Sequence, residues 1–522
     1  MHGWAIAGDA LRSAADAFAN GAAAAKAIAV DVLGTGAVST GGRAHALASN
    51  ATQAPVTTVT GNREVLMAEL CAANAPPCNL PMTVAGVGRW PADRTHANFP
   101  HLPSAICHLP SAICLSMPFI RDPLWNNIRI DGPYLRLADT PVVQRLRYVR
   151  QLGLAHLVYP GATHSRFEHA LGAYHLANRT LARLLEAGML ARIAPDEPAV
   201  VTAAALLHDI GHYPFSHALE EIGAMHHEAV AEPMITGGEV ADILRREIAP
   251  DAPERVFALI RGESTSPLQG LISGSLDLDK TDYLKRDALM CGVPYGEIDV
   301  DRLLHALVIV DDPHLGRAAI GVLEKALSAL ESLLFAKYQM YRNVYWHHAV
   351  RSPTAMYKRL VADALRAGAL DATELVAHTD EGLLHALRAR SPSALIEALL
   401  SRRLFKRAME CPAAELDGLD LEWMAEDHDR ARRAEDAIAA SLGFAPGEVL
   451  LDYPQKEQML GLDIPVLTRD GRVERLTSEG MAGAINLPVL ADQLYRSARW
   501  LRVFTARRVS IPKDEVLRLL EV

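Results

Sequence analysis

The sequence predicts a mainly helical fold that ends in a smaller part of mixed helices and strands. Half of the 522 residues are apolar but only 6% are aromatic, with many Ala and Leu, a composition that favours helices. Beyond residue 117, most segments place apolar residues at helical spacing. Near the C-terminus, Asp470-Gly471 stands between two apolar runs, which is typical of a β-hairpin turn.

The length allows two or three domains, and the residue pattern divides the chain into residues 1–116, 117–351 and 352–522. A net charge of −10 gives no indication of general nucleic-acid or anionic-membrane binding. No apolar run is long enough to span a bilayer. The six cysteines show neither metal-ligand spacing nor a disulfide framework, which indicates a reducing, cytoplasmic location.

Residues 1–116 do not resemble the rest of the chain. They are rich in Ala, Gly, Thr and Pro and have little amphipathic pattern, and the seven residues from His101 are repeated from His108. We interpret this segment as a disordered leader, or as upstream DNA translated from an early start, with Met117 as the natural beginning. The alternative is a short repeat module.

From Met117 onward we predict a small hairpin followed by a series of helices. The hairpin turns at Asp131-Gly132, and the first helix has Asp139 or Thr140 as its cap and Pro141 in its first turn. Further helices are predicted over residues 165–185, up to 208, from 226, 239–248, 276–287 and 319–345. Beyond Ser352 the chain is predicted to be helical, with a hairpin over residues 464–477 and a strand over residues 501–506.

The stretch 203–217 is the most informative part of the sequence. An apolar run ends in His208 and Asp209, and His212 and His217 follow. Buried polar groups are costly unless something binds them, and imidazole together with carboxylate suits a divalent transition metal. The alternative is a helix end whose histidines face solvent.

Three predicted helices supply residues that together can hold a divalent ion and leave positions open for water and a substrate oxygen: His169, His208, Asp209 and Asp279. Cations on or beside the same elements can neutralise phosphate: Arg166, Lys280 and Arg342. Histidines that can transfer protons near neutral pH are His212, His217 and His227. Asp279, Tyr283 and Asp287 are four apart on one helix face, which alone fits a solvated face equally well.

In order and spacing, the segments 139–148, 166–169, 208–217 and 277–283 resemble the HD-domain phosphohydrolases. Within them the chain is most similar to the SAM-and-HD-domain dNTP triphosphohydrolase and its bacterial dGTPase-like relatives, without a SAM domain. The resemblance runs from about residue 120 to 351 and more loosely to the end. It implies a helical HD core with small hairpins and a smaller α+β C-terminal part.

The resemblance also implies an enzyme, a metal-dependent nucleotide phosphohydrolase. The activity it implies most directly is dNTP triphosphohydrolase, which gives a deoxynucleoside and tripolyphosphate. One alternative is a phosphomonoesterase or phosphodiesterase that acts on another phosphorylated metabolite. Another is a nucleotide-sensing regulator with vestigial activity. Implied partners are a nucleotide substrate, an activating nucleotide and further copies of the chain in a dimer or tetramer.

Carried over position by position, the resemblance assigns roles to individual residues. The metal ligands would be His169, His208, Asp209 and Asp279, holding Fe, Mn, Zn, Ni or Co, with Mg for the triphosphate. The catalytic residue would be His217, supported by Glu220 and His227. The triphosphate would contact Arg166, His212, Lys280 and Arg342. The deoxyribose would contact Gln151, Leu152, Tyr283 and Asp287. An activator nucleotide between subunits would contact Asp139, Gln144 and Arg147, which could equally be structural.

The sequence departs from the family pattern at three positions. Glu220 stands where the dNTP triphosphohydrolase has Asp, a longer arm beside His217. Trp346 and Val350 stand where that enzyme has a His and a Tyr that lines the sugar pocket. These departures leave the metal chemistry intact and leave the identity of the base and sugar open.

Overall fold

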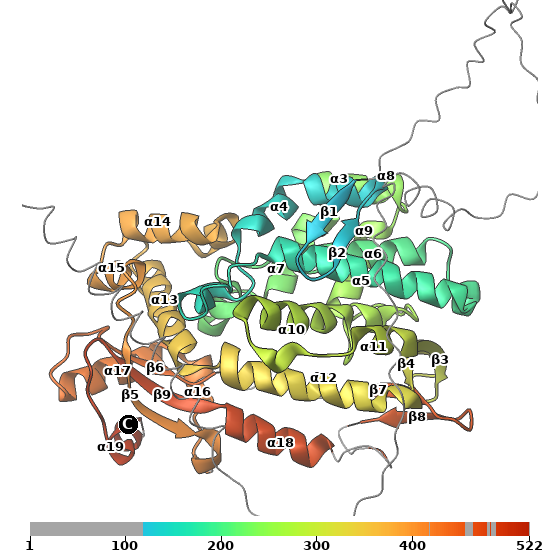
Figure 1. Ribbon diagram of the computed structural model, residues 1–522. Helices are drawn as coiled ribbons and strands as arrows, with labels where there is room; N and C mark the ends of the chain where they lie inside the picture. The colour runs from blue at the N-terminus through green and yellow to red at the C-terminus, as the bar shows by residue number, and fades with distance from the viewer. Residues whose placement is uncertain (1–117, 417, 455–462, 478–480, 482–486, 521–522) are drawn as a thin grey trace, which may run out of the picture. The chain divides into compact units, whose positions relative to one another are not determined.

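The computed structural model describes residues 118–416, 418–454, 463–477, 481 and 487–520. The predicted leader and its repeat lie outside the described residues. The described chain is mainly helical and contains one two-stranded, one four-stranded and one three-stranded sheet (Figure 1). The predicted fold class, a helical core with small hairpins and a C-terminal part of mixed helices and strands, is confirmed.

The first half of the described chain is a hairpin followed by helices that pack around α5. Its elements are β1 (Phe119–Asp122), β2 (Asn126–Arg129), α3 (Gly132–Asp139), α4 (Pro141–Gln144), α5 (Arg166–Glu186), α6 (Glu197–Leu207), α7 (His227–Thr236), α8 (Gly238–Glu247), α9 (Ala252–Arg261), α10 (Leu278–Cys291) and α11 (Val300–Ala306). Both α6 and α10 contact α5, and α9 contacts α6.

The second half alternates helices with short strands. Its elements are β3 (Leu307–Asp312), β4 (Arg317–Leu323), α12 (Leu327–Met340), α13 (His348–Arg366), α14 (Asp380–Arg390), α15 (Ala394–Leu400), β5 (Lys406–Pro412), α16 (Trp423–Glu426), α17 (His428–Ser441), β6 (Val449–Asp452), β7 (Ile464–Leu467), β8 (Val473–Leu476), α18 (Leu487–Ala498), β9 (Trp500–Thr505) and α19 (Lys513–Leu520). One sheet has the order β3-β4-β7-β8, with β4 and β7 parallel, and the other has the order β5-β9-β6.

Helix α6 lies at the centre of the main core. Its residues from Val200 to Leu207 are all buried, so apolar side chains surround the whole helix, as expected for a helix enclosed by other elements. Burial of each larger apolar side chain contributes about 1.5–3 kcal/mol, and this packing fixes the point where His208 follows. No helix within the described residues is long and apolar enough to cross a membrane.

The predicted hairpin around Asp131-Gly132 is wrong. The hairpin lies earlier, where β1 pairs with β2 from Phe119 opposite Arg129 to Asp122 opposite Asn126. Gly132 has a φ of +54° and begins α3, with a proline in the first turn of the helix. Proline is well suited to that position because it has no N–H to leave unsatisfied, so the Asp-Gly-Pro sequence starts a helix here.

The predicted helix over residues 319–345 is also wrong in its first part. β4 occupies Arg317–Leu323 and pairs with β3, α12 begins only at Leu327, and a π-helical turn follows at Tyr341–Tyr345. Residues 318–323 are small or apolar and fit a helix or a strand equally well by spacing. Pairing with the β-branched residues of β3 decides in favour of the strand.

Other predicted elements agree with the structure. α5 begins at Arg166 after the cap residue Ser165, and α4 begins at Pro141 after Thr140. The predicted hairpin at Asp470-Gly471 is the β7–β8 pair, and the predicted C-terminal strand is β9. α4 is shorter than predicted, because the chain continues from Arg145 as a 3₁₀ turn.

Candidate active site

Three helices bring together the four side chains that were predicted to bind metal: His169 from the first turn of α5, His208 and Asp209 directly after α6, and Asp279 from the first turn of α10. A capping box fixes the start of α5, because the Ser165 hydroxyl accepts from the Glu168 N–H and the Glu168 carboxylate accepts from the Ser165 N–H. We refer to the four residues as the metal set.

The donor atoms of the metal set face one another. His169 Nε2 lies 3.0 Å from Asp279 Oδ1 and 3.1 Å from His208 Nε2. His208 Nε2 lies 3.5 Å from Asp209 Oδ1, and its Nδ1 lies 2.9 Å from the Ala205 carbonyl oxygen. Nitrogen and oxygen ligands bind a zinc ion at about 2.0–2.2 Å, which places them about 3 Å from one another. His169, His208 and Asp209 offer ligand atoms that all lie within 4.8 Å of one another and could hold one metal ion, and Asp279 lies beside them, next to His169.

A buried chain of charged groups orients His169. Its Nδ1 lies 2.8 Å from Asp282 Oδ2, Arg286 donates to both Asp282 oxygens at 2.8 and 3.0 Å, and Arg286 also donates to Asp122 at 2.7 Å. Gly172 on α5 makes room for this chain, since a Cβ there would lie 1.9 Å from Asp282 Oδ1. Metal-binding histidines usually have such a carboxylate on the second ring nitrogen.

The charges of the metal set suit a cation. Burial raises the pKa of the Asp209 carboxyl, but Arg166 and the two imidazoles outweigh it and hold that pKa well below its usual range. Burial lowers the pKa of His169, yet hydrogen bonds to Asp279 and Asp282 raise it to about 10. His169 must be neutral to bind metal, so metal binding releases a proton and rising pH favours it.

Asp282→Asn is expected to lower metal affinity about 10- to 100-fold, the usual cost of losing an outer-shell partner. The amide cannot match the carboxylate that holds the His169 ring and pairs with Arg286. Metal titration followed by calorimetry measures the effect, with the exposed Asp242 on α8, changed to Asn, as control. Unchanged affinity in Asp282→Asn would show that this chain of charges serves folding alone.

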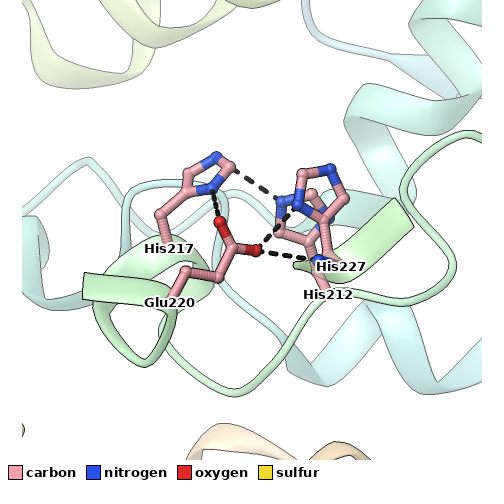
Figure 2. A group of neighbouring side chains, drawn as sticks. All are labelled: His212, His217, Glu220 and His227. Atoms are coloured by element: carbon pink, nitrogen blue, oxygen red, sulfur yellow. Dashed lines mark hydrogen bonds and ion pairs between the residues drawn. The ribbon is translucent and has the colours of Figure 1, made fainter. Parts of the chain in front are cut away.

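A second cluster lies beside the metal set and consists of His212, His217, Glu220 and His227 (Figure 2). Glu220 accepts from both neighbours, with His217 Nδ1 at 3.1 Å from Oε2 and His227 Nδ1 at 2.7 Å from Oε1. His212 Nε2 lies 3.5 Å from His217 Nε2, and its ring centroid lies 3.7 Å from that of His227. We call this group the histidine cluster.

The histidine cluster surrounds His217 with one ionised and two neutral neighbours. Burial raises the pKa of Glu220, but His217 and His227 outweigh it and keep Glu220 ionised. Burial lowers the pKa of His212 well below its usual range, and that of His227 to about 4, so both are neutral near pH 7. His212 Nδ1 faces Asp209 Oδ1 at 3.2 Å, which leaves the Nε2 lone pair toward His217. His217 thus faces an acceptor at each nitrogen.

A cavity of about 380 Å³ opens next to both groups, within the usual size range of small-molecule sites. Predicted site residues that line it are Gln151, Leu152, Arg166, His217, Asp279, Lys280, Tyr283 and Asp287. Trp346 and Val350 line it as well. Its wall therefore combines cations, carboxylates and aromatic rings, the groups that a nucleotide requires.

The described chain matches known families over the residues that build this site. Residues 166–287 match the HD domain, and residues 298–480 match the HD associated region. The first range contains the whole metal set and the histidine cluster. The chain is an HD-domain protein.

Several relatives share this domain. The HD-domain chain is 35% identical over 305 residues to the uncharacterized protein MJ1154 of Methanocaldococcus jannaschii, which covers 58% of this chain and 62% of that protein. It is 31% identical over 263 residues to the deoxynucleoside triphosphate triphosphohydrolase SAMHD1 homolog of Dictyostelium discoideum, covering 48% and 49%. The chain thus spans about half to three fifths of the length of these relatives. A crystal structure of a phosphohydrolase from Bacteroides thetaiotaomicron shares the fold, with a TM-score of 0.59 and 23% identity over 75% of this chain and 100% of that one.

Some predicted site residues of this HD-domain protein do not line the cavity. The Arg342 side chain is exposed and donates to the Tyr338 hydroxyl at 2.6 Å. Glu220, His212 and His227 are also absent from the cavity lining, and Glu220 and His212 contact His217, which does line it. Of the metal set, Asp279 lines the cavity, whereas His169, His208 and Asp209 do not.

The three residues predicted to bind an activator lie together near the end of α3 and α4. Arg147 donates to Gln144 Oε1 at 2.8 Å and stacks on the Phe167 ring, and Gln144 donates to the Ala138 carbonyl at 2.7 Å. Asp139 is exposed at the end of α3. These local contacts suit the structural interpretation of Gln144 and Arg147.

The sequence did not reveal the buried charged residues that orient His169, nor several of the residues that line the cavity. Asp282 and Arg286 are four residues apart on α10 and both fully buried, and the Trp125 indole N–H also donates to Asp282. A second charged pair at helical spacing, directly beside the stripe of Asp279, Tyr283 and Asp287, was the signal for it. Further cavity residues without an assigned role were Lys337, Tyr341, Tyr345 and Arg351.

Proposed function

We propose that this HD-domain protein is a metal-dependent nucleotide phosphohydrolase, and specifically a dNTP triphosphohydrolase. The observation that carries the proposal is a group of metal-ligand side chains of which Asp279 lines a cavity, together with cations and with acceptors for hydroxyl groups on the wall of the same cavity. Similarity to the Dictyostelium discoideum protein, whose name gives this activity, supports it.

The residues of the metal set fit a divalent ion by donor type and spacing. When bound, such an ion lowers the pKa of water and polarises a phosphoryl oxygen. The chain's own cations supply the remaining charge neutralisation for phosphate. Arg166 already contacts Asp209 at 2.5 Å, and Lys280 donates to the Gly274 carbonyl oxygen at 2.9 Å, so both are held at the cavity wall.

His217 is the group best placed to donate a proton. Its side chain is 58% exposed, whereas that of its neighbour His212 is 1% exposed. Its Nδ1 lies 3.1 Å from Glu220 Oε2, a carboxylate that holds the ring in place. In its protonated form His217 gives a proton to the oxygen that leaves phosphorus, which is general acid catalysis.

The other wall of the cavity presents a buried acceptor without a partner. Gln151 Oε1 is buried and makes no hydrogen bond within the described structure, although Gln151 lines the cavity. An unsatisfied buried polar atom costs about 1–3 kcal/mol, so a ligand that donates to it gains binding energy. A sugar hydroxyl is such a donor, and Asp287, which lines the same cavity, is a second acceptor.

Metal-loaded protein is expected to convert dGTP to deoxyguanosine and tripolyphosphate. If Arg166 and Lys280 hold the phosphate chain and His217 protonates the 5′-oxygen, the bond between that oxygen and the α-phosphorus breaks. In ¹⁸O-labelled water the label should then appear in tripolyphosphate and not in the nucleoside. Ion-exchange chromatography with mass spectrometry measures both.

Release of dGDP or dGMP would contradict the proposed cleavage at the α-phosphorus, but the protein would still be a phosphohydrolase. Turnover of phosphomonoesters or phosphodiesters, with no action on dGTP, would favour the alternative substrate class. Asp242→Asn serves as the matched protein control, because Asp242 is exposed on α8.

A further inference from the structure

The cavity contains a carboxylate that two neighbours hold in place. His164 Nε2 lies 2.8 Å from Asp287 Oδ1, and the Tyr345 hydroxyl donates to Asp287 Oδ2 at 2.7 Å. Burial, followed by the charge of Asp287, raises the pKa of Tyr345 well above its usual value, so the phenol keeps its proton and stays the donor. Its oxygen retains lone pairs that can accept from a ligand.

Three hydrogen-bond acceptors belong to residues that line this cavity: the Asp287 carboxylate and the Tyr345 oxygen, which are hydrogen-bonded to each other, and Gln151 Oε1. The backbone N–H of Gln151 donates to the backbone carbonyl oxygen of His164 at 3.0 Å. This bond keeps Gln151 next to His164, the residue that pairs with Asp287. Each carboxylate oxygen can accept a further hydrogen bond beyond those it already has. The group, which we call the acceptor set, suits a ligand that offers more than one hydroxyl.

Helix α10 fixes the separation between the acceptor set and the metal set. Asp279 and Asp287 are two helical steps of four residues apart, about 12 Å along the axis. Tyr283 lies between them, with its ring centroid 6.4 Å from that of His169 and 6.5 Å from that of Tyr345. When the phosphate of a nucleotide occupies the metal set, this separation places its sugar against the acceptor set.

Tyr345 lies at a local irregularity in the chain. The last turn before Trp346 is π-helical, Tyr341–Tyr345, and such turns are frequent at functional sites. Tyr341, Tyr345 and Trp346 all line the cavity. Val350 lines it too, and its small side chain does not fill the space that a bulky ring would take.

We propose that Tyr345 and Asp287 together bind two neighbouring hydroxyl groups of a sugar, so that ribonucleoside triphosphates are substrates alongside deoxyribonucleoside triphosphates. The inference rests on the proposed function and adds a specificity-determining residue to it. Asp287 accepts from the 3′-hydroxyl, and the Tyr345 oxygen accepts from the 2′-hydroxyl. The 2′-hydroxyl is thus recognised rather than excluded.

The test compares GTP with dGTP in the wild type and in Tyr345→Phe. The wild type is expected to cleave both, with kcat/KM values within about tenfold of each other. Tyr345→Phe keeps the ring and removes the acceptor, so kcat/KM for GTP should fall about three- to tenfold more than that for dGTP. Because both substrates are measured on the same protein, a general loss of fold or metal cancels in the ratio. Tyr134→Phe, which changes a hydroxyl on α3 that donates to Ala199, should leave the ratio unchanged.

Two results would overturn the inference and leave the proposed function standing: cleavage of dGTP without any cleavage of GTP, or a GTP to dGTP ratio that Tyr345→Phe does not change. Failure of the wild type to cleave either nucleotide would instead overturn the proposed function. Calorimetry with guanosine and 2′-deoxyguanosine then still decides the role of Tyr345. The wild type should bind guanosine at least as tightly, and Tyr345→Phe should selectively weaken guanosine.

Discussion

Asp209→Asn is expected to give a protein without bound metal and without phosphohydrolase activity. The amide carries no charge and is a poor ligand for a divalent ion. The substitution removes a carboxylate that lies 3.5 Å from His208 Nε2 and also accepts a hydrogen bond from Arg166. Metal affinity should fall by more than the roughly 10- to 100-fold typical of an outer-shell change. Metal content by mass spectrometry and dGTP turnover measure the two losses.

Two further variants make this result interpretable. Asp279→Asn should behave like Asp209→Asn, and its side chain is 33% exposed, so folding depends less on it. Asp242→Asn on α8 should retain both metal and turnover. A variant of Asp209 that still binds metal and cleaves dGTP would show that the metal set is assigned wrongly.

The sequence predicted those parts of the fold that local rules determine. Ser165 and Glu168 form the capping box that starts α5, and the apolar run before His208 forms the enclosed helix α6. It could not decide residues 317–323, because their spacing fits a helix or a strand and only the pairing with β3 makes them β4. The start of α3 was misread because Asp-Gly also occurs in hairpin turns.

The candidate site was predictable where function depends on residue type. Imidazole and carboxylate in the stretch 203–217 indicated metal binding, and the structure brings His169 and Asp279 to the same point. Residues that act by holding others carried a weaker signal. Asp282 and Arg286 look like a surface ion pair at helical spacing, and only the fold shows that both are fully buried. Tyr345 lies in a π-helical turn, and no local sequence pattern indicated that turn.

His217→Ala is expected to keep bound metal and to lower kcat for dGTP about 10²- to 10⁴-fold, the usual contribution of a general acid. His217 lies outside the metal set, and its neighbour His212 contacts Asp209. Its removal therefore leaves the four ligands in place. His305→Ala, at an exposed position on α11, is the matched control and should retain metal and turnover.

The leaving group separates proton donation by His217 from a structural role. Hydrolysis of p-nitrophenyl triphosphate at the α-phosphorus releases a phenolate that needs no proton to leave. His217→Ala should therefore lose far less activity on this ester than on dGTP, whose 5′-oxygen must be protonated. Glu220 holds His217 at 3.1 Å, so Glu220→Gln should show the same pattern to a smaller degree. Equal losses on both substrates, or loss of metal from His217→Ala, would mean that His217 shapes the site and does not donate the proton.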